Sequence, residues 1–478
     1  MILIESHQIR PDDERFDELS DVLRRSSNLR NSALYQWRQA FFLELPLPEF
    51  GDICYMFALS DQKDYRSLPA KVAQATVKSV FKEIESFFAL LHSDYADDHR
   101  IGVPDYKPRG RRYVATYTSQ AISKTELVED GVVRLSGTEV RVKTRQAPES
   151  IRQVRVVPHN GYIAVEVAYE VEDVPMMEDN GRYASLDPGV NNLATVAFNT
   201  GRGFIIRGGP MKSIIQYRCK REAQLVSKLE DLKERELLKT GGIHGKKAVE
   251  EFRKQREEER QKALRALAEC RRAEEEGLDE REVKELRRER KRMSRKAKRV
   301  ARRQARMRAA KKAKKFSSKR LESLRRKSWN KLMDYMHKSS SELVNRLVSK
   351  NTSTLFMGKN KGWTQEVNLG RVVNQMFVAM PIAVFLEMVA YKCRKCGIRV
   401  VYVQESYTSK CSFLDGESIC HHDRYLGKRV KRGLFRSADG TLINADLNGA
   451  LNIMRKAIGD FDYPIEVCSA PVVLTIKV

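Results

Sequence analysis

The chain has 478 residues, with 89 Lys or Arg against 63 Asp or Glu and a formal net charge of +26. This length allows several domains with a sizeable core, and the charge indicates a polyanionic partner, either nucleic acid or an acidic membrane. No apolar run approaches the roughly 20 residues of a spanning helix, and the first five residues are too short and too acidic for a signal peptide.

Eight irregularly spaced cysteines favour a reducing compartment over a disulfide framework. We therefore expect a bacterial-type cytoplasmic protein, associated with the nucleoid and without a membrane partner.

The first 180 residues predict a helical region followed by a β-rich one. After a short opening strand, residues 26–42 predict a helix, and apolar side chains recur at helical spacing over residues 73–91. From residue 101, Pro and Gly break the helical pattern. A small sheet or barrel is then predicted from β-rich runs at 113–117, 132–135, 154–157 and 162–169.

The rest of the chain predicts strands separated by long helices. Three strands are expected in quick succession, at 183–186, 193–198 and near 204–207. A charged helical region, 212 to about 348, comes next. It is followed by a strand at 353–357, a helix at about 375–396, a strand at 398–403, a loop and a last helix after residue 446. This order matches the RNase H topology, in which three meandering strands precede parallel ones.

Two acidic motifs stand at the expected ends of these elements. Asp187 closes the first strand of this region in Ser-Leu-Asp-Pro-Gly, and Asp446 opens the last helix in Asn-Ala-Asp-Leu-Asn-Gly. Hard divalent cations favour carboxylate ligands, and hydrolysis of a phosphodiester with two metals requires a cluster of them. Each motif also has a simpler interpretation, because Asp187 could be a turn residue and Asp446 a helix N-cap.

These motifs resemble those of the TnpB family, transposon-encoded RNA-guided DNA endonucleases that are ancestral to the type V CRISPR effectors. The resemblance is carried by residues 186–194 and 444–453, and also by 405–410 and 427–436. It implies a guide RNA, a double-stranded DNA target with a short adjacent motif, two Mg²⁺ ions, and a monomer or a homodimer on one RNA.

The resemblance also implies an α+β multidomain fold, in which a helical recognition domain and a small wedge-like β-barrel precede an RNase H-like (RuvC) α/β nuclease domain with a long basic helical insertion. The expected domains are a barrel of residues 1–15 and 101–180, a recognition domain of 16–100, a nuclease domain of 181–210 and 350–460, a basic insertion of 211–349, a degenerate zinc-ribbon-like insertion of 406–440 and a C-terminal tail of 461–478.

The family places its second carboxylate directly after the strand that here ends at residue 357, where this chain has Gly358 and Lys359. One interpretation is a dead site, which leaves an RNA-guided DNA-binding, repressor-like protein. The other is a relocated ligand. Glu405 closes the next strand, and adjacent strands are about 5 Å apart, a distance that a Glu side chain can largely span.

Glu366 is a poorer candidate because nothing fixes its position. We favour a working Mg²⁺ site of Asp187, Glu405 and Asp446. A structural RNA-binding protein with a decayed nuclease fold is the alternative from another class.

A zinc site receives less support from the sequence. The family often carries a four-cysteine ribbon, of which two cysteines remain here. The candidate ligands are Cys411, Cys420, His421 and His422. Cys393 and Cys396 also have ligand spacing, but they fall in the last turn of a helix. We do not expect bound zinc.

The excess charge is concentrated within the predicted insertion. Residues 281–320 contain 21 Lys or Arg against 3 Glu, a net charge of +18. Such a run suits contacts with a nucleic-acid backbone that do not depend on sequence. The predicted nucleic-acid-binding residues are Lys107, Arg109, Arg111, Arg112, Arg292, Arg295, Lys296, Arg299, Arg302, Arg303, Arg306, Lys311, Lys312, Lys428, Arg429 and Arg432.

Overall fold

The computed structural model describes residues 1–93, 101–240, 254, 258, 261, 319–359, 379–431, 433–463, 471–474 and 476. The chain divides into two compact units, one of residues 1–215 and 325–478 and the other of residues 216–324. The basic run at 281–318 lies outside the described residues, so its predicted role stays a prediction.

The N-terminal sheet joins the two ends of the first 170 residues. Its antiparallel strands lie in the order β1-β6-β5-β2 and span β1 (Ile2–Ile9), β6 (Tyr162–Glu170), β5 (Ile151–His159) and β2 (Ala115–Thr118). The opening strand pairs with β6 along its whole length, from Ile2↔Glu170 to Ile9↔Ile163. A small sheet is therefore confirmed, and its closure into a barrel stays a prediction.

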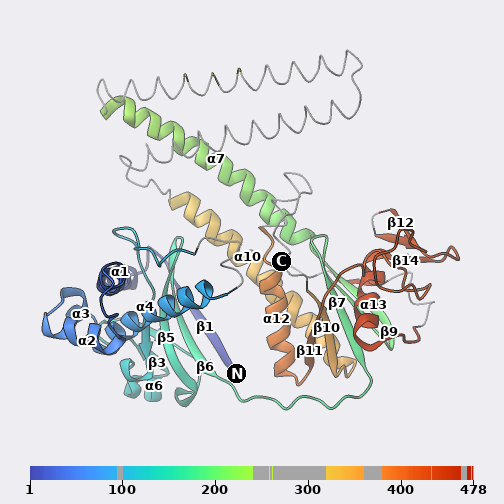
Figure 1. Cartoon of the computed structure of the whole chain (residues 1–478), viewed down its shortest axis with the longest axis horizontal. Coiled ribbons are helices and arrows are strands. Elements are labelled where there is room, and N and C mark those ends of the chain that lie inside the picture. The colour runs from blue at the N-terminus through green and yellow to red at the C-terminus, as the bar shows by residue number, and fades with distance from the viewer. Residues whose placement is uncertain are drawn as a thin grey trace. The chain divides into compact units, whose positions relative to one another are not determined.

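Helices cover this sheet and share its core (Figure 1). They are α1 (Arg15–Phe42), α2 (Phe50–Leu59), α3 (Lys63–Ser67) and α4 (Ala70–Leu91). On α4 the predicted apolar stripe is buried from Ala73 to Ile84, with Val77 and Val80 fully enclosed, whereas Leu91 at its end is exposed. Smaller elements complete the region: η1 (Ser119–Ala121), α6 (Lys124–Asp130), β3 (Val132–Arg134), β4 (Arg141–Lys143) and η2 (Pro148–Ser150).

A second sheet has six strands in the order β11-β10-β7-β8-β9-β15. They are β7 (Tyr183–Pro188), β8 (Asn192–Phe198), β9 (Gly201–Arg207), β10 (Thr354–Gly358), β11 (Arg399–Val403) and β15 (Val472–Leu474). The first three form an antiparallel meander, while β10 lies parallel to β7 and β11 parallel to β10. The predicted strand succession is thus present.

The sixth strand was not predicted. Residues 472–474, within the segment expected to be a C-terminal tail, pair in parallel with β9. Their short apolar run satisfies the otherwise open edge of that strand.

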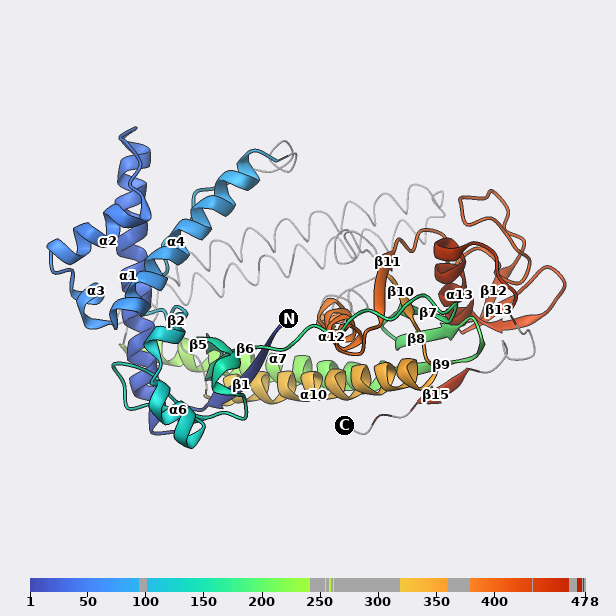
Figure 2. The ribbon, with the colours of Figure 1, turned by 90° about the horizontal axis from the view of Figure 1, so that it is seen from below.

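Helix α13 (Ala445–Ile458) packs against β7, β8 and β10 (Figure 2). Its buried residues Leu447, Ala450 and Leu451 form a core with Phe356 of β10. The remaining helices are α7 (Gly209–Thr240), α10 (Lys319–Ser349) and α12 (Ile382–Lys395). The helix expected at about 375–396 begins only at Ile382, with Pro381 as its N-cap, and residues 375–378 of the expected range lie outside the described residues.

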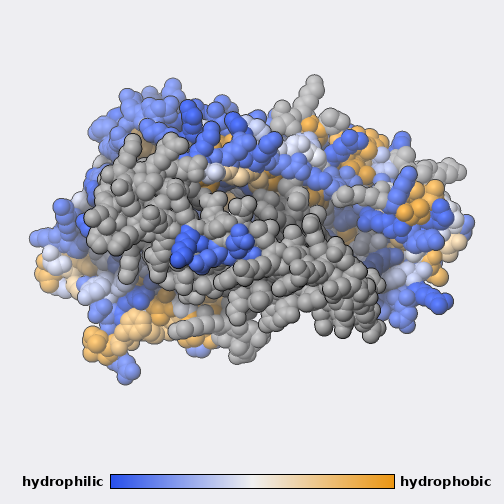
Figure 3. All heavy atoms as spheres, turned by 90° about the horizontal axis from the view of Figure 1, so that it is seen from above, coloured by the Kyte–Doolittle hydropathy of each residue, from blue (hydrophilic) through white to orange (hydrophobic). Residues whose placement is uncertain are grey.

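Between β11 and α13 the chain forms a small lobe, residues 406–444. Its three-stranded antiparallel sheet has the order β12-β13-β14 and consists of β12 (Lys428–Lys431), β13 (Leu434–Arg436) and β14 (Leu442–Asn444). None of the described helices combines the length and the apolar character that a bilayer crossing requires. Figure 3 views the molecule from above relative to Figure 1. On this face hydrophilic side chains cover much of the described surface, and separate apolar patches interrupt them.

Candidate active site

Asp187 lies at the end of β7 on the face that α13 covers. Strand side chains alternate between faces, so Ser185 and Asp187 point the same way, and the Ser185 hydroxyl donates to the Ala450 carbonyl of α13 at 2.6 Å. A Cβ at Gly449 would stand 2.9 Å from Asp187 Oδ2. The carboxylate therefore lies directly against α13, where glycine leaves room for it.

Asp446 lies in the first turn of α13 but does not cap the helix. The N-cap is Asn444, whose side-chain oxygen accepts the backbone N–H groups of Asp446 at 3.0 Å and of Leu447 at 3.1 Å. The N-cap interpretation of Asp446 is wrong. Its carboxylate instead accepts hydrogen bonds from Asn192 Nδ2 at 2.6 Å and from the Arg429 guanidinium at 3.0 Å.

Glu405 reaches back from the end of β11 toward β10. Gly358 pairs with Val403, two residues before Glu405. A Cβ built on Gly358 would overlap Glu405 Oε1 and stand 2.8 Å from its Cγ and 2.9 Å from its Cδ. The Glu405 carboxylate thus occupies the space that a side chain at position 358 would fill.

Gly358 also lies beside Asp187. The parallel pairing of β10 with β7 puts Met357 opposite Leu186, so the next residues, Gly358 and Asp187, stand at the ends of neighbouring strands. The position at which the TnpB resemblance expects a carboxylate therefore holds one, supplied by the adjacent strand.

The electrostatics indicate that Asp187 lies within the influence of the other two carboxylates. Burial raises the pKa of Asp187 well above its ordinary value, and the negative charges of Glu405 and Asp446 raise it further. Burial also raises the pKa of Glu405 to about 7. A carboxylate whose pKa is raised by burial or by neighbouring negative charges is stabilised in its ionised form by a nearby cation.

The donor chemistry of this cluster suits a hard divalent cation, which prefers carboxylate oxygens. Within the described ranges, however, no three His, Cys, Asp or Glu side chains stand ready to coordinate one ion. Binding a cation here therefore requires side-chain rotation, and Asp446 would have to exchange its contact with Arg429.

The zinc candidates come together only in part. Cys420 Sγ lies 3.4 Å from His422 Nε2, while the Cys411 thiol contacts the Cys420 carbonyl oxygen at 3.6 Å. The His421 ring packs edge-on against Tyr407, with 6.0 Å between the ring centroids. The Glu417 carboxylate ties this loop together by accepting the backbone N–H groups of Ser412 and Leu426.

The predicted nucleic-acid contacts within the described residues fall into two groups. Arg109 and Arg111 are exposed in the loop before β2, whereas Arg112 packs its guanidinium over Phe16, 4.9 Å from the ring centroid. Lys428 is exposed on β12, and Arg429 is the residue paired with Asp446. Lys107, also in the loop before β2, has its ammonium over the Tyr113 ring, 5.6 Å from the centroid. The remaining predicted contacts, from Arg292 to Lys312 together with Arg432, lie outside the described residues.

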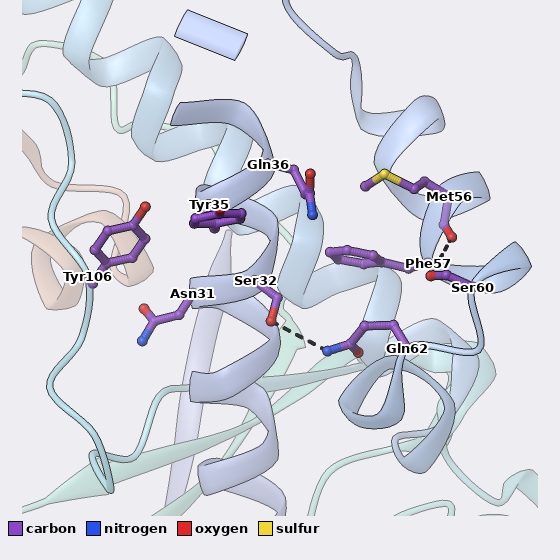
Figure 4. A pocket seen from close by; sticks show the side chains of 9 residues that line it. All are labelled: Asn31, Ser32, Tyr35, Gln36, Met56, Phe57, Ser60, Gln62 and Tyr106. Atoms are coloured by element: carbon purple, nitrogen blue, oxygen red, sulfur yellow. Dashed lines mark hydrogen bonds between the residues drawn. The ribbon is translucent and has the colours of Figure 1, made fainter. Parts of the chain in front are cut away.

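The helical region also contains a hollow of about 540 Å³ that the sequence did not indicate. Tyr35, Gln36 and Ser32 project into it from α1, with Tyr106 on one side and Phe57 on the other (Figure 4). Its lining residues are scattered from position 31 to 106 and share no motif, so no sequence pattern could have found it.

Two family models match the chain. One, described as the TNB domain of Cas12f1-like proteins, covers residues 383–453, and the other, described as a probable transposase (OrfB_IS605), covers residues 166–279. The first match includes both Glu405 and Asp446, and the second includes Asp187. The predicted resemblance to TnpB and the compact type V effectors is confirmed.

Two curated relatives share parts of this sequence. The CRISPR-associated endodeoxyribonuclease Cas12f2 of Micrarchaeota archaeon (strain CG1_02_47_40) is 28% identical over 144 residues, which cover 27% of this chain and 24% of that protein. The TnpB-like protein ORF457 of Acidianus two-tailed virus is 29% identical over 130 residues, covering 27% of this chain and 26% of the relative. The matched segments thus span about a quarter of each relative.

Among solved structures, the Cas12f1–sgRNA–target DNA complex aligns with 92% of this chain and 82% of its own, at 12% identity and a TM-score of 0.45. Alicyclobacillus acidoterrestris C2c1 in complex with single-guide RNA aligns with 93% of this chain and 67% of its own, at 10% identity and a TM-score of 0.32.

Proposed function

We propose that this chain is an RNA-guided DNA endonuclease with a RuvC-like site, in which Asp187, Glu405 and Asp446 hold two Mg²⁺ ions. The observation that carries this proposal is the fit between Gly358 and Glu405. The family position has lost its side chain, and the Glu405 carboxylate fills the space. If the site had decayed, nothing would require a glycine at position 358 to be matched by a glutamate carboxylate in the same space. The match therefore favours a relocated ligand over a dead site.

The residues of this chain would prepare the site in distinct ways. Asn192 holds one oxygen of Asp446, and the Asn444 cap fixes the helix turn that carries it. The absence of a side chain at Gly449 lets Asp187 lie flat against α13. Glu405, whose pKa is about 7, must give up its proton to act as a ligand. Bound Mg²⁺ supplies charge neutralisation of the attacking and leaving oxygens, and water is the nucleophile.

The proposed partners are a guide RNA and a double-stranded DNA target with a short adjacent motif, bound by a monomer or a homodimer on one RNA. The net charge of +26 supports a polyanionic partner. The names of the matched relatives, an endodeoxyribonuclease and a TnpB-like protein, support the same assignment.

Cleavage of a target plasmid, with the guide RNA that copurifies and with Mg²⁺, tests the proposal. We expect the wild type to cut and both Asp187→Ala and Glu405→Ala to bind target without cutting. Asp423→Ala removes an exposed carboxylate from the neighbouring lobe and serves as the matched control, which should cut normally. Target binding without cleavage by the wild type would establish the dead-site alternative. Unchanged cleavage by Glu405→Ala would exclude Glu405 as a ligand.

A further inference from the structure

The loop between α4 and β2 has neither helix nor strand over residues 101–108, yet it is tied closely to α1. The Arg38 guanidinium donates to the Pro104 carbonyl at 2.6 Å. Asn31 makes two bonds to Lys107, donating to its carbonyl at 2.8 Å and accepting its backbone N–H at 2.9 Å. Further along, the Tyr113 N–H donates to the Leu23 carbonyl at 3.0 Å. The loop therefore follows α1 from Arg38 back to Leu23.

A buried arginine holds the same loop from inside. Arg30 is 1% exposed and forms a two-pronged ion pair with Glu83, which also accepts the Tyr113 hydroxyl at 2.8 Å. The remaining Arg30 nitrogen donates to the Asp105 carbonyl at 3.0 Å. Burying a guanidinium is costly unless each donor finds a partner. One N–H donor of the buried Arg30 guanidinium therefore holds the loop backbone in place at Asp105.

The anchored loop presents two exposed arginines at its tip. The Arg111 N–H donates to the Pro108 carbonyl at 3.0 Å and closes a tight turn, in which Gly110 adopts a φ of 77°. Arg109 and Arg111 flank this glycine and are both exposed. Neither guanidinium pairs with a carboxylate among the described residues. Exposed cations on an anchored loop are suited to an external anion.

We propose that residues 104–113 form a preformed phosphate clamp. Arg109 and Arg111 contact the phosphodiester backbone of a nucleic-acid duplex, and Asn31 and Arg30 are positioning residues that hold the loop ready. A rigid element loses little conformational freedom on binding, and a duplex offers phosphates at regular spacing along each strand. The inference rests on the proposed function only in taking nucleic acid as the partner.

The first experiment measures the binding of fluorescent DNA and RNA duplexes by the full chain, without guide RNA and with chelator, so that no cleavage occurs. The variant Arg109→Ala/Arg111→Ala is compared with Arg10→Ala/Arg145→Ala, which removes two exposed arginines elsewhere in the same region. Loss of two phosphate contacts should reduce the slope of log K against log salt by about 1.8 for the clamp pair alone. Whichever duplex, DNA or RNA, shows this reduced salt slope is the partner of the clamp. Equal slopes and affinities for the two double variants, with both duplexes, would overturn the phosphate contact.

The second experiment tests positioning without a change of charge. Asn31→Ala keeps every cation but frees Lys107, and we expect its duplex affinity to fall about three- to tenfold. Asn28 lies on the same helix as Asn31 and donates to Asp64 of α3, so Asn28→Ala is the matched control and should bind normally. Hydrogen exchange at the Lys107 amide should accelerate only in Asn31→Ala, because that amide donates to Asn31. Faster exchange with unchanged affinity would overturn the positioning role. If Asn31→Ala fails to fold, the exposed arginine pairs still decide the phosphate contact.

These measurements are independent of catalysis. A chain that never cleaves DNA but shows the clamp-dependent slope would refute the nuclease proposal and leave this inference standing. A chain that cleaves DNA under guide control but binds duplexes with the same salt slope in the clamp and control variants would support the nuclease proposal and refute the phosphate clamp.

Discussion

Replacing Gly358 by alanine is the sharpest perturbation of the proposed site, because it acts on Glu405 without removing any carboxylate. The new Cβ would lie 2.8–2.9 Å from Glu405 Cγ and Cδ. Carbon atoms in contact are about 3.5–4.0 Å apart. The Glu405 side chain must therefore move by about 1 Å, and a misplacement of about 1 Å at a reacting centre costs on the order of 100-fold in rate.

Stability should change little in the same variant. Glu405 is half-buried and can rotate away, and Gly→Ala stabilises by roughly 0.4–1 kcal/mol through the unfolded chain when the backbone permits it. The expected signature is a near-normal thermal midpoint with a strong loss of guide-dependent plasmid cleavage under single-turnover conditions. Gly209→Ala, where an added Cβ meets nothing within 4 Å, is the matched control. Wild-type cleavage by Gly358→Ala would refute the reasoning.

A compensating variant tests the same geometry from the other side. Gly358→Glu combined with Glu405→Ala places a carboxylate at the position where the TnpB resemblance expects one. If the two positions serve one site, the double variant should cut faster than Glu405→Ala alone, measured in the same assay. A double variant as inactive as Glu405→Ala, although folded and able to bind target, would argue that position 358 does not reach the site.

Three further predictions concern the same carboxylates. Arg429→Gln frees Asp446 from its ion pair, so calorimetry should show Mg²⁺ bound more tightly, whereas weaker binding would mean that Arg429 supports the site. Burial lifts the pKa of Glu405 from 4.5 to about 7, so the folded chain binds that proton more tightly than the unfolded one. The cation-free protein should lose stability in thermal melts as pH rises from about 4.5 to about 7, and Mg²⁺ affinity should rise as Glu405 loses its proton near the upper end of this window. Asn444→Ala removes the cap of α13 and should cost about 1 kcal/mol in denaturant unfolding; an unchanged midpoint would contradict the capping role.

Regular apolar patterns made most of the fold predictable. The runs that became β7, β8, β10 and β11 are bounded by turn residues and follow the chain order expected of an RNase H-type domain. The exceptions are short or polar. β15 has three residues, and β12 consists of Lys-Arg-Val-Lys with no apolar alternation, so its strand conformation comes from pairing with β13.

The sequence indicated which residues form the proposed site but not how their side chains are arranged. Asn444 and Asp446 are both good N-cap residues, and sequence cannot decide which one caps the helix. The missing side chain at position 358 suggested a ligand one strand away. Only the structure shows that glycine is required there, since any Cβ would displace Glu405.

The small lobe of residues 406–444 is connected to the proposed site at both of its ends. It begins directly after Glu405 and ends directly before the α13 turn that carries Asp446, so both of its attachment points are proposed ligands. Its edge strand β12 also carries Arg429, whose guanidinium contacts the Asp446 carboxylate. Because Asp187 is fixed in the centre of the sheet while Glu405 lies two residues beyond its own strand, a displacement of the lobe would shift two ligands and leave the third in place.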